Sequence, residues 1–258
     1  MNLVSRILRD EGIADHEACC SDPSADPALL LRLAQYGSRY PGALGLRLAA
    51  NPGMPIDGLL QLTRLYPLEV SENPAFRMKI AIEPAFLSSL SMTIQRRLVR
   101  RQGVDGRLIR QLAGPRNRPV SVRATAARNP GCPTDLLEDY PRHAWSVRAA
   151  LATNPILPLA LQLRLAQDPK HQVRKRLSER QPLDPALLSV LCHPKQHPHV
   201  LRAIARNPTT PKKCLDDLMV WSPIEVQNAI HIRRETPEGL TLIAEAKRLF
   251  PVPPCPRA

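Results

Sequence analysis

Short apolar segments recur along the chain, and each one is closed by proline. In the clearest copies apolar residues lie at i, i+4 and i+5, as at Val122, Ala126 and Ala127. This spacing places the three side chains on one face of a short helix. An Asn-Pro pair then follows, and the proline ring disfavours helical backbone at the residue before it. Each of these helices is therefore predicted to end at its Asn, namely at Asn51, Asn129, Asn154 and Asn207.

A second proline three residues later opens a leucine-rich segment. In several copies the residue before this proline is Asp or Thr, which is the order of an N-cap followed by proline at the first helical position. These pairs are Asp26-Pro27, Asp184-Pro185, Thr210-Pro211 and Thr236-Pro237. Paired leucines such as Leu136 and Leu137 give the segment a buried face. Each unit is thus predicted to hold two short helices, with the prolines marking their ends.

The unit V-R-x-x-(L/A)-A-x-N-P-x-x-P-x-x-L-L-x-x-L repeats throughout the chain. Clear copies cover 120–145, 146–172, 173–199 and 200–218, and degenerate copies cover 44–60, 94–115 and 226–240. Successive copies start 22 to 29 residues apart, so about nine units fill the chain. A unit this short cannot bury both of its helices alone, and its neighbours must complete the core. We expect an all-α solenoid and a single domain over 1–250.

The two ends of the chain differ from the repeat. Residues 1–22 are predicted to form an N-terminal cap and 240–250 a C-terminal cap helix. A proline-rich tail at 251–258 is predicted to be disordered.

The copy VRAALATNPILPLALQLRLAQDP at 147–169 resembles the repeat of the leucine-rich repeat variant family, and the resemblance extends over residues 44–240. It implies a right-handed α-solenoid, a superhelix of alternating α- and 3-10 helices that serves as a binding scaffold for diverse partners. The founding member of that family holds a four-iron four-sulfur centre in an N-terminal cysteine cluster. Only Cys19 and Cys20 lie in the corresponding region of this chain, so no cofactor is predicted.

Composition narrows the class of protein. The chain has 28 prolines but only 11 glycines, which excludes collagen and flexible linker sequences. No apolar stretch is long enough to span a bilayer, and the N-terminus lacks the apolar region of a secretory signal. We expect a cytoplasmic protein that does not associate with a membrane.

The formal charge of +13 is concentrated in the middle of the chain. Residues 94–215 contain 23 Lys and Arg against 7 Asp and Glu, an excess of 16, whereas the flanking segments are slightly acidic. Such a surface favours an acidic macromolecular partner.

Cationic residues recur in the loops that join successive units. Four consecutive loops carry Arg116/Arg118, Arg142/His143, Lys170/His171 and Lys195/His197. Because equivalent positions of stacked units form a line, these residues are predicted to make one basic ridge that binds a partner, with solubilising surface charge as the alternative. A second predicted line consists of the arginines before the Asn position: Arg101, Arg128, Arg180 and Arg206. The arginines of the V-R pairs, Arg123, Arg148 and Arg174, are instead expected to pair with a carboxylate or with helix carbonyls.

Two metal hypotheses are weaker than their structural alternatives. Three histidines and a thiol lie between Cys192 and His199, which could bind a metal, but this run aligns with the other cationic loops. The six cysteines occupy repeat positions and have no CxxC spacing, so buried thiols are expected and no metal site is predicted.

Catalytic motifs are absent from the sequence, including a phosphate-binding glycine loop, GxSxG and HExxH. No catalytic residue and no small-molecule substrate are predicted. One enzyme class remains as an analogy, the HEAT-like-repeat DNA glycosylases, for which the candidate residues are Trp145, Trp221, Asp139 and Asp168.

The partner is predicted to be an acidic protein, and the alternative is the backbone of duplex DNA or RNA. Nine aromatic residues are too few for stacking along a single strand.

Overall fold

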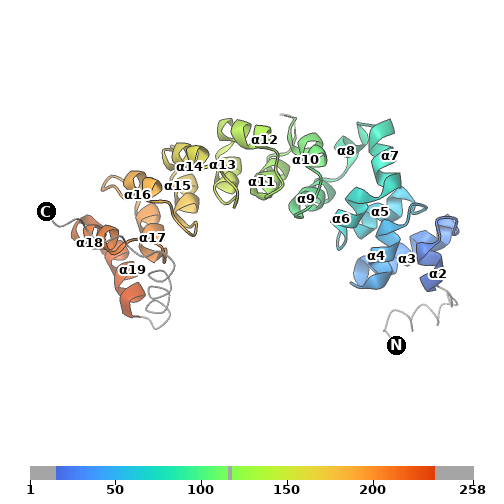
Figure 1. Ribbon diagram of the computed structural model, residues 1–258, viewed down its shortest axis with the longest axis horizontal. Helices are drawn as coiled ribbons and strands as arrows, with labels where there is room; N and C mark the ends of the chain where they lie inside the picture. Colours follow the sequence, from blue (N-terminus) through green and yellow to red (C-terminus); the bar gives the residue numbers. More distant parts are fainter. Residues whose placement is uncertain (1–15, 116–117, 236–258) are drawn as a thin grey trace. The chain divides into compact units, whose positions relative to one another are not determined.

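A computed structural model of the chain describes residues 16–115 and 118–235 (Figure 1). Over these residues the secondary structure is helical, without strands, which confirms the predicted all-α class. The chain divides into two compact units, Met1–Leu136 and Leu137–Ala258. The predicted C-terminal cap helix and tail lie outside the described residues, as does the predicted N-terminal cap apart from its last residues.

Unit 1 is a series of short helices in which each packs on its neighbours. For example, α3 packs on α4 and α5, and α9 packs on α10 and α11. The helices are α2 (His16–Ser21), α3 (Pro27–Arg39), α4 (Ala43–Ala50), α5 (Ile56–Leu62), α6 (Pro67–Glu72), α7 (Pro74–Ile82), α8 (Phe86–Ser89), α9 (Met92–Arg100), α10 (Gly106–Ala113) and α11 (Val120–Arg128), followed by α12 (Thr134–Asp139) at the boundary.

Unit 2 shows the repeat most clearly. Its elements are η1 (Tyr140–Arg142), α13 (Trp145–Leu151), α14 (Leu159–Ala166), α15 (His171–Ser178), α16 (Pro185–Leu191), α17 (Pro198–Arg206), α18 (Lys212–Trp221) and α19 (Ile224–Glu235). The first helices of the units, α13, α15, α17 and α19, pack one on the next, and α14 packs on α16 (Figure 1). Within the described ranges η1 is the only 3-10 helix, so the alternation of α- and 3-10 helices implied by the resemblance is not observed there.

The predicted apolar face is the buried one. Val122, Ala126 and Ala127 are fully buried, and the same holds for the equivalent residues of α13 and α17. To compare the units, we number each first helix from its buried residue at the start of this pattern. Position 1 is Val122 in α11, Val147 in α13, Val173 in α15, Val200 in α17 and Val226 in α19. The same count gives Leu44 for α4, Tyr66 for α6 and Ile94 for α9.

Polar residues end the helices largely as predicted. Asn51, Asn129 and Asn207 are the C-cap residues of α4, α11 and α17. Asp26 and Asp184 cap α3 and α16 through their side chains, with proline at the next position. Thr210-Pro211 differs, because α18 begins at Lys212 and the Thr210 hydroxyl donates instead to the Ile204 carbonyl. Thr236-Pro237 lies outside the described residues.

A series of side chains at position 8, here called the ladder, joins successive repeats. The Nδ2 group of Asn129 donates to the carbonyls of Val99 and Arg101, both at 2.7 Å, and its Oδ1 accepts from the Gly131 amide. Asn51, Asn73 and Asn207 make the same pattern of bonds to the unit before them. The last carbonyls of a helix lack partners within it, so this amide satisfies polar groups that the core would otherwise leave unbonded.

Arg180 takes the place of asparagine in this ladder. Counted from Val173 it occupies position 8, and its guanidinium donates to the carbonyls of Ala152 and Asn154 at 3.0 and 2.6 Å. The linker that follows is one residue longer than in the asparagine units, and the extra residue is Gln181. The prediction that Arg180 lies on the surface line before the Asn position is therefore wrong. It rested on counting back from the proline, and the extra residue shifts that count by one.

Candidate binding surface

The cationic loops of unit 2 lie next to each other. Arg148 donates to the His143 carbonyl at 2.7 Å and makes a two-pronged pair with the Asp168 carboxylate of the following loop. Arg174 in turn donates to the Asp168 carbonyl and, at 2.9 Å, to the Gln196 amide oxygen. These two arginines at position 2 therefore tie three consecutive loops together.

The Arg148–Asp168 pair confirms the structural role expected for this arginine. The Asp168 side chain is only 4% exposed and that of Arg148 16%, with Nε 2.5 Å from Oδ2. The hydrogen bond to the carboxylate raises the pKa of Arg148 above its ordinary value. Asp168 also accepts from the Lys170 backbone amide, so this carboxylate is fully used in fixing the loop.

Three lysine and arginine side chains of the predicted ridge project from these tied loops. Lys170 and Lys195 are exposed, and Arg142 is exposed with one guanidinium nitrogen 3.7 Å from Asp139. Arg118 belongs to unit 1, where it is half-buried and donates weakly to the Gln111 carbonyl, and Arg116 lies outside the described residues. The structure thus places Arg142, Lys170 and Lys195 on consecutive loops of one unit.

The histidines of the same loops contact neighbouring side chains. His143 is 8% exposed, and its Nε2 lies 2.7 Å from Asp139. The rings of His171 and His197 stack in parallel with their centroids 3.8 Å apart. Burial, and then the neighbouring positive charges, lower the pKa of both rings, which disfavours their charged form. The ridge therefore owes its charge to lysine and arginine.

Stacked imidazoles direct their nitrogens in parallel and do not converge on one ion. Among residues 16–115 and 118–235, no group of three His, Cys, Asp or Glu side chains is arranged to hold a metal.

The second predicted line separates into three kinds of arginine. Arg180 is in the ladder, and burial lowers its pKa from the ordinary value. Arg101 also occupies position 8, but it is exposed and its nearest bond is a 3.4 Å contact with the Leu65 carbonyl. Arg128 and Arg206 are at position 7 and exposed.

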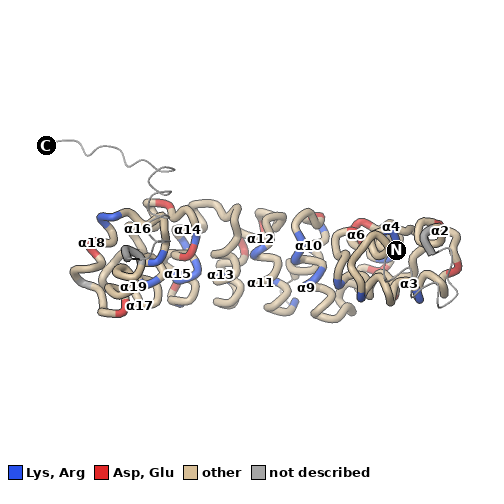
Figure 2. Tube along the Cα trace, turned by 90° about the horizontal axis from the view of Figure 1, so that it is seen from below, with Lys and Arg blue, Asp and Glu red and all other residues tan. Residues whose placement is uncertain are grey.

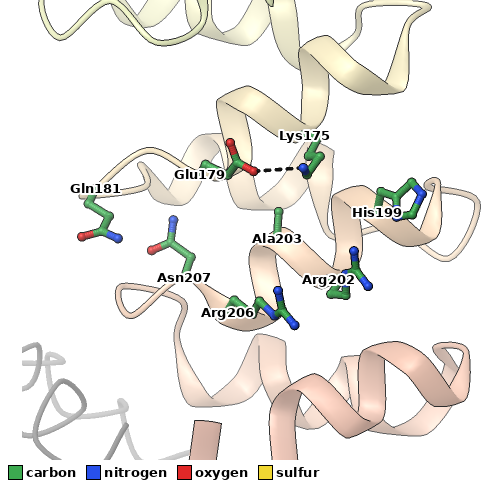
Figure 3. A pocket seen from close by; sticks show the side chains of 8 residues that line it. All are labelled: Lys175, Glu179, Gln181, His199, Arg202, Ala203, Arg206 and Asn207. Carbon is green, nitrogen blue, oxygen red and sulfur yellow. Dashed lines mark ion pairs between the residues drawn. The ribbon is translucent and has the colours of Figure 1, made fainter. Parts of the chain in front are cut away.

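A pocket of about 240 Å³ opens between α15 and α17 (Figure 3). Lys175 and Glu179 on α15 form one wall, joined by an ion pair of 3.3 Å, and Arg202 and Arg206 on α17 form the opposite wall. Gln181, His199, Ala203 and Asn207 complete the lining. The side chains of Arg202 and Arg206 have no ion pair or hydrogen bond to any residue that the structure describes.

The pocket residues lie at two positions of the repeat, of which only position 7 was predicted, at Arg206. Lys175 and Arg202 are at position 3 of their helices, and Glu179 and Arg206 are at position 7. The same positions in unit 1 carry exposed Arg96 and Arg100 on α9 and Arg128 on α11. Residues three and four apart lie on one face of a helix, so this spacing indicates position 3 as well, whereas the loops, the V-R pairs and the residue before the Asn do not. Lys and Arg positions gather along α15 in Figure 2.

The carboxylates considered for a glycosylase are engaged elsewhere. Asp168 is held by Arg148, and Asp139 by His143. Trp145 is 46% exposed at the start of α13, and the side chain of Trp221 is not among those described.

None of the five cysteines in the described ranges forms a disulfide. Cys20 and Cys132 are buried as expected, whereas Cys19, Cys192 and Cys214 are half-buried. A hydrogen bond between the last two thiols lowers the pKa of Cys192 and raises that of Cys214.

No helix within residues 16–115 and 118–235 combines the length and the apolar character required to cross a membrane. Comparisons of the chain with models of known protein families, with curated proteins and with solved structures find no match.

Proposed function

We propose that this chain is a non-enzymatic scaffold, a right-handed α-solenoid of about nine repeats of roughly 26 residues of the leucine-rich repeat variant type. The position-8 ladder supports this architecture. In five repeats the side chain at position 8, which is Asn in four of them and Arg180 in the fifth, donates hydrogen bonds to carbonyls of the preceding repeat. Regular stacking of this kind is the property on which repeat scaffolds are built.

We further propose that the scaffold binds an acidic protein through the cationic surface of unit 2. This surface consists of Arg142, Lys170 and Lys195 on the loops and Arg202 and Arg206 on α17. The supporting observation is that positive charge at positions 3 and 7 does not continue from one first helix to the next. Positions 3 and 7 are Ala149 and Thr153 on α13, and they are Asn228 and Ile232 on α19.

A duplex backbone presents phosphates at regular intervals and is bound by cations at matching intervals. The interruption by neutral positions on α13 and α19 does not suit that pattern. Exposed apolar side chains accompany the cations in unit 2, including Trp145, Ile156 and Ile232. Aromatic side chains and arginine together are typical of protein interfaces.

The test is capture of partners on the full-length protein from lysate of its source cells, with quantitative mass spectrometry. The variant Lys170→Glu/Lys195→Glu reverses two exposed loop charges, and Arg39→Glu/Arg64→Glu reverses two exposed charges of unit 1 as the matched control. We expect an acidic protein to be retained by the wild type and the control and lost from the loop variant.

Binding to random duplex DNA is measured beside it at about 150 mM salt. Micromolar binding to DNA, with a steep dependence on salt that becomes shallower in the loop variant, would overturn the protein partner in favour of nucleic acid.

A further inference from the structure

We propose that the α15–α17 pocket is a receptor for a phosphate monoester, such as a phosphorylated serine or threonine side chain of the partner. The inference rests on the proposed function, because it names the group that the acidic partner presents to this surface.

The charge of the pocket fits a dianion. Lys175, Arg202 and Arg206 contribute three positive charges, and Glu179 removes one, which leaves a balance of +2. A phosphate monoester carries about −1.5 to −2 charges at pH 7, whereas a carboxylate or a phosphodiester carries one. Of the three anions, the monoester therefore comes closest to neutralising the pocket.

Two donors of the pocket, the guanidinium groups of Arg202 and Arg206, are available and suitably spaced. Lys175 is already paired with Glu179, which also accepts from Arg176 at 3.0 Å. Arg202 and Arg206 are one helical turn apart on α17, so both guanidiniums can reach an anion in the same space. A guanidinium group can bind a phosphate through two parallel hydrogen bonds, so arginine suits a phosphate ligand better than a cation that makes a single contact.

The site is local to one pair of helices. Position 3 on α13 is Ala149 and on α19 is Asn228, so the cationic register does not continue to either neighbour of the pocket helices. A receptor for one side-chain phosphate needs no continuation, whereas a groove for a nucleic-acid strand does. The size also fits, because about 240 Å³ holds a phosphate group with part of its side chain and is too small for a segment of duplex.

The probe is N-acetyl-O-phosphoserine methylamide, titrated into the full-length protein at pH 7.5. Binding is followed by NMR through the Nε–Hε signals of Arg202 and Arg206. N-acetyl-aspartate methylamide and dimethyl phosphate serve as the singly charged comparisons. We expect the phosphoserine compound to bind roughly fivefold more tightly than either, because charge-assisted bonds to two guanidiniums depend on the anion charge. Equal affinities for the three compounds would overturn the proposal.

The variant Arg202→Gln/Arg206→Gln keeps the length of the side chains and removes both charges. It should weaken phosphoserine binding roughly tenfold, whereas Lys170→Gln/Lys195→Gln removes the same charge from the loops and should change it by less than about twofold. Equal losses in the two variants would show that the general potential of unit 2, and not the pocket, binds the anion. Unchanged circular dichroism of both variants verifies that they fold.

Two further arms separate this inference from the proposed function. A 20-base-pair duplex that displaces the phosphoserine compound from wild type would assign the pocket to nucleic acid and overturn the proposal. Partner capture is also repeated after phosphatase treatment of the lysate. Loss of the partner supports a phosphorylated ligand. Retention of the partner, with continued dependence on Lys170 and Lys195, would overturn the phosphate receptor while leaving the acidic-protein scaffold intact.

Discussion

Arginines on two of the first helices of unit 2, α13 and α17, have opposite surroundings. At position 2 of α13, Arg148 is tied to the buried Asp168 carboxylate and to a loop carbonyl. At position 3 of α17, Arg202 lines a pocket without a partner among the described residues, while position 2 of that helix is the buried Leu201. A shift of one residue along the helix changes the direction of the side chain by about 100°. Position within the repeat therefore decides whether an arginine holds neighbouring loops together or lines the pocket.

The largest expected effect is a difference in unfolding free energy between alanine variants at these two positions. Arg148→Ala leaves the Asp168 carboxylate buried without its cation, which should lower the free energy of unfolding by about 3 kcal/mol or more. Arg202→Ala should change it by no more than about 0.5 kcal/mol, because the half-buried side chain that is removed has no partner among the described residues. Urea unfolding followed by circular dichroism measures both. Similar losses in the two variants would remove the distinction between the positions.

A smaller effect is expected where arginine replaces the ladder asparagine. Arg180→Ala leaves the carbonyls of Ala152 and Asn154 without their donor, and should cost about 1–2 kcal/mol of unfolding free energy. Arg206→Ala, one position earlier in its own unit, is the matched control and should cost no more than about 0.5 kcal/mol. The assignment of Arg180 to position 8 would be contradicted by a neutral Arg180→Ala together with a destabilising Arg206→Ala.

The smallest effect concerns the stacked histidines on the loop side of α15 and α17. Burial and then nearby charge lower the folded-state pKa of His171 and His197 below the ordinary value of about 6.5, the charged neighbours being Lys170, Arg174 and His199. The unfolded chain thus binds more protons, and stability rises with pH. This contribution is fully present above about pH 6.5 and is lost as the pH falls through the folded pKa.

The urea midpoint should accordingly fall between pH 7.5 and pH 5, and it should fall less in His171→Gln/His197→Gln. A midpoint of the wild type that rises on acidification, or an equal fall in the variant, would contradict this origin of the pH dependence.

Much of the fold could be predicted because it depends on local chemistry. An Asn before proline ends a helix, an Asp before proline starts one, and apolar residues at i, i+4 and i+5 lie on one face. These rules place the ends of α4, α11 and α17 and the starts of α3 and α16. The pairing of a V-R arginine with a carboxylate also followed from the sequence and is seen at Arg148, whereas Arg174 bonds to a backbone carbonyl and to a glutamine side chain.

The candidate site was less predictable because it depends on which side chains turn outward after the units pack. Arg180 was misplaced by the extra Gln181, and the histidines of the cationic loops were counted as surface charge although His143 is buried against Asp139. Arg202 was not among the predicted binding residues, because it lies outside the V-R pairs and outside the loops. Its role depends on the facing Lys175 and Glu179, which lie 27 and 23 residues away in the chain.

The position-8 ladder also determines where the chain can change its length. The distance from position 1 to position 8 is fixed, because the side chain must reach two carbonyls of the preceding unit. Of the repeats with arginine at this position, those of Arg101 and Arg180 contain one more residue immediately after it. In the first of these, Gly103 accommodates the longer linker with a φ of 87°. Insertions can thus accumulate behind the ladder residue without disturbing the stack, so the linkers are where copies of the repeat are able to diverge from one another.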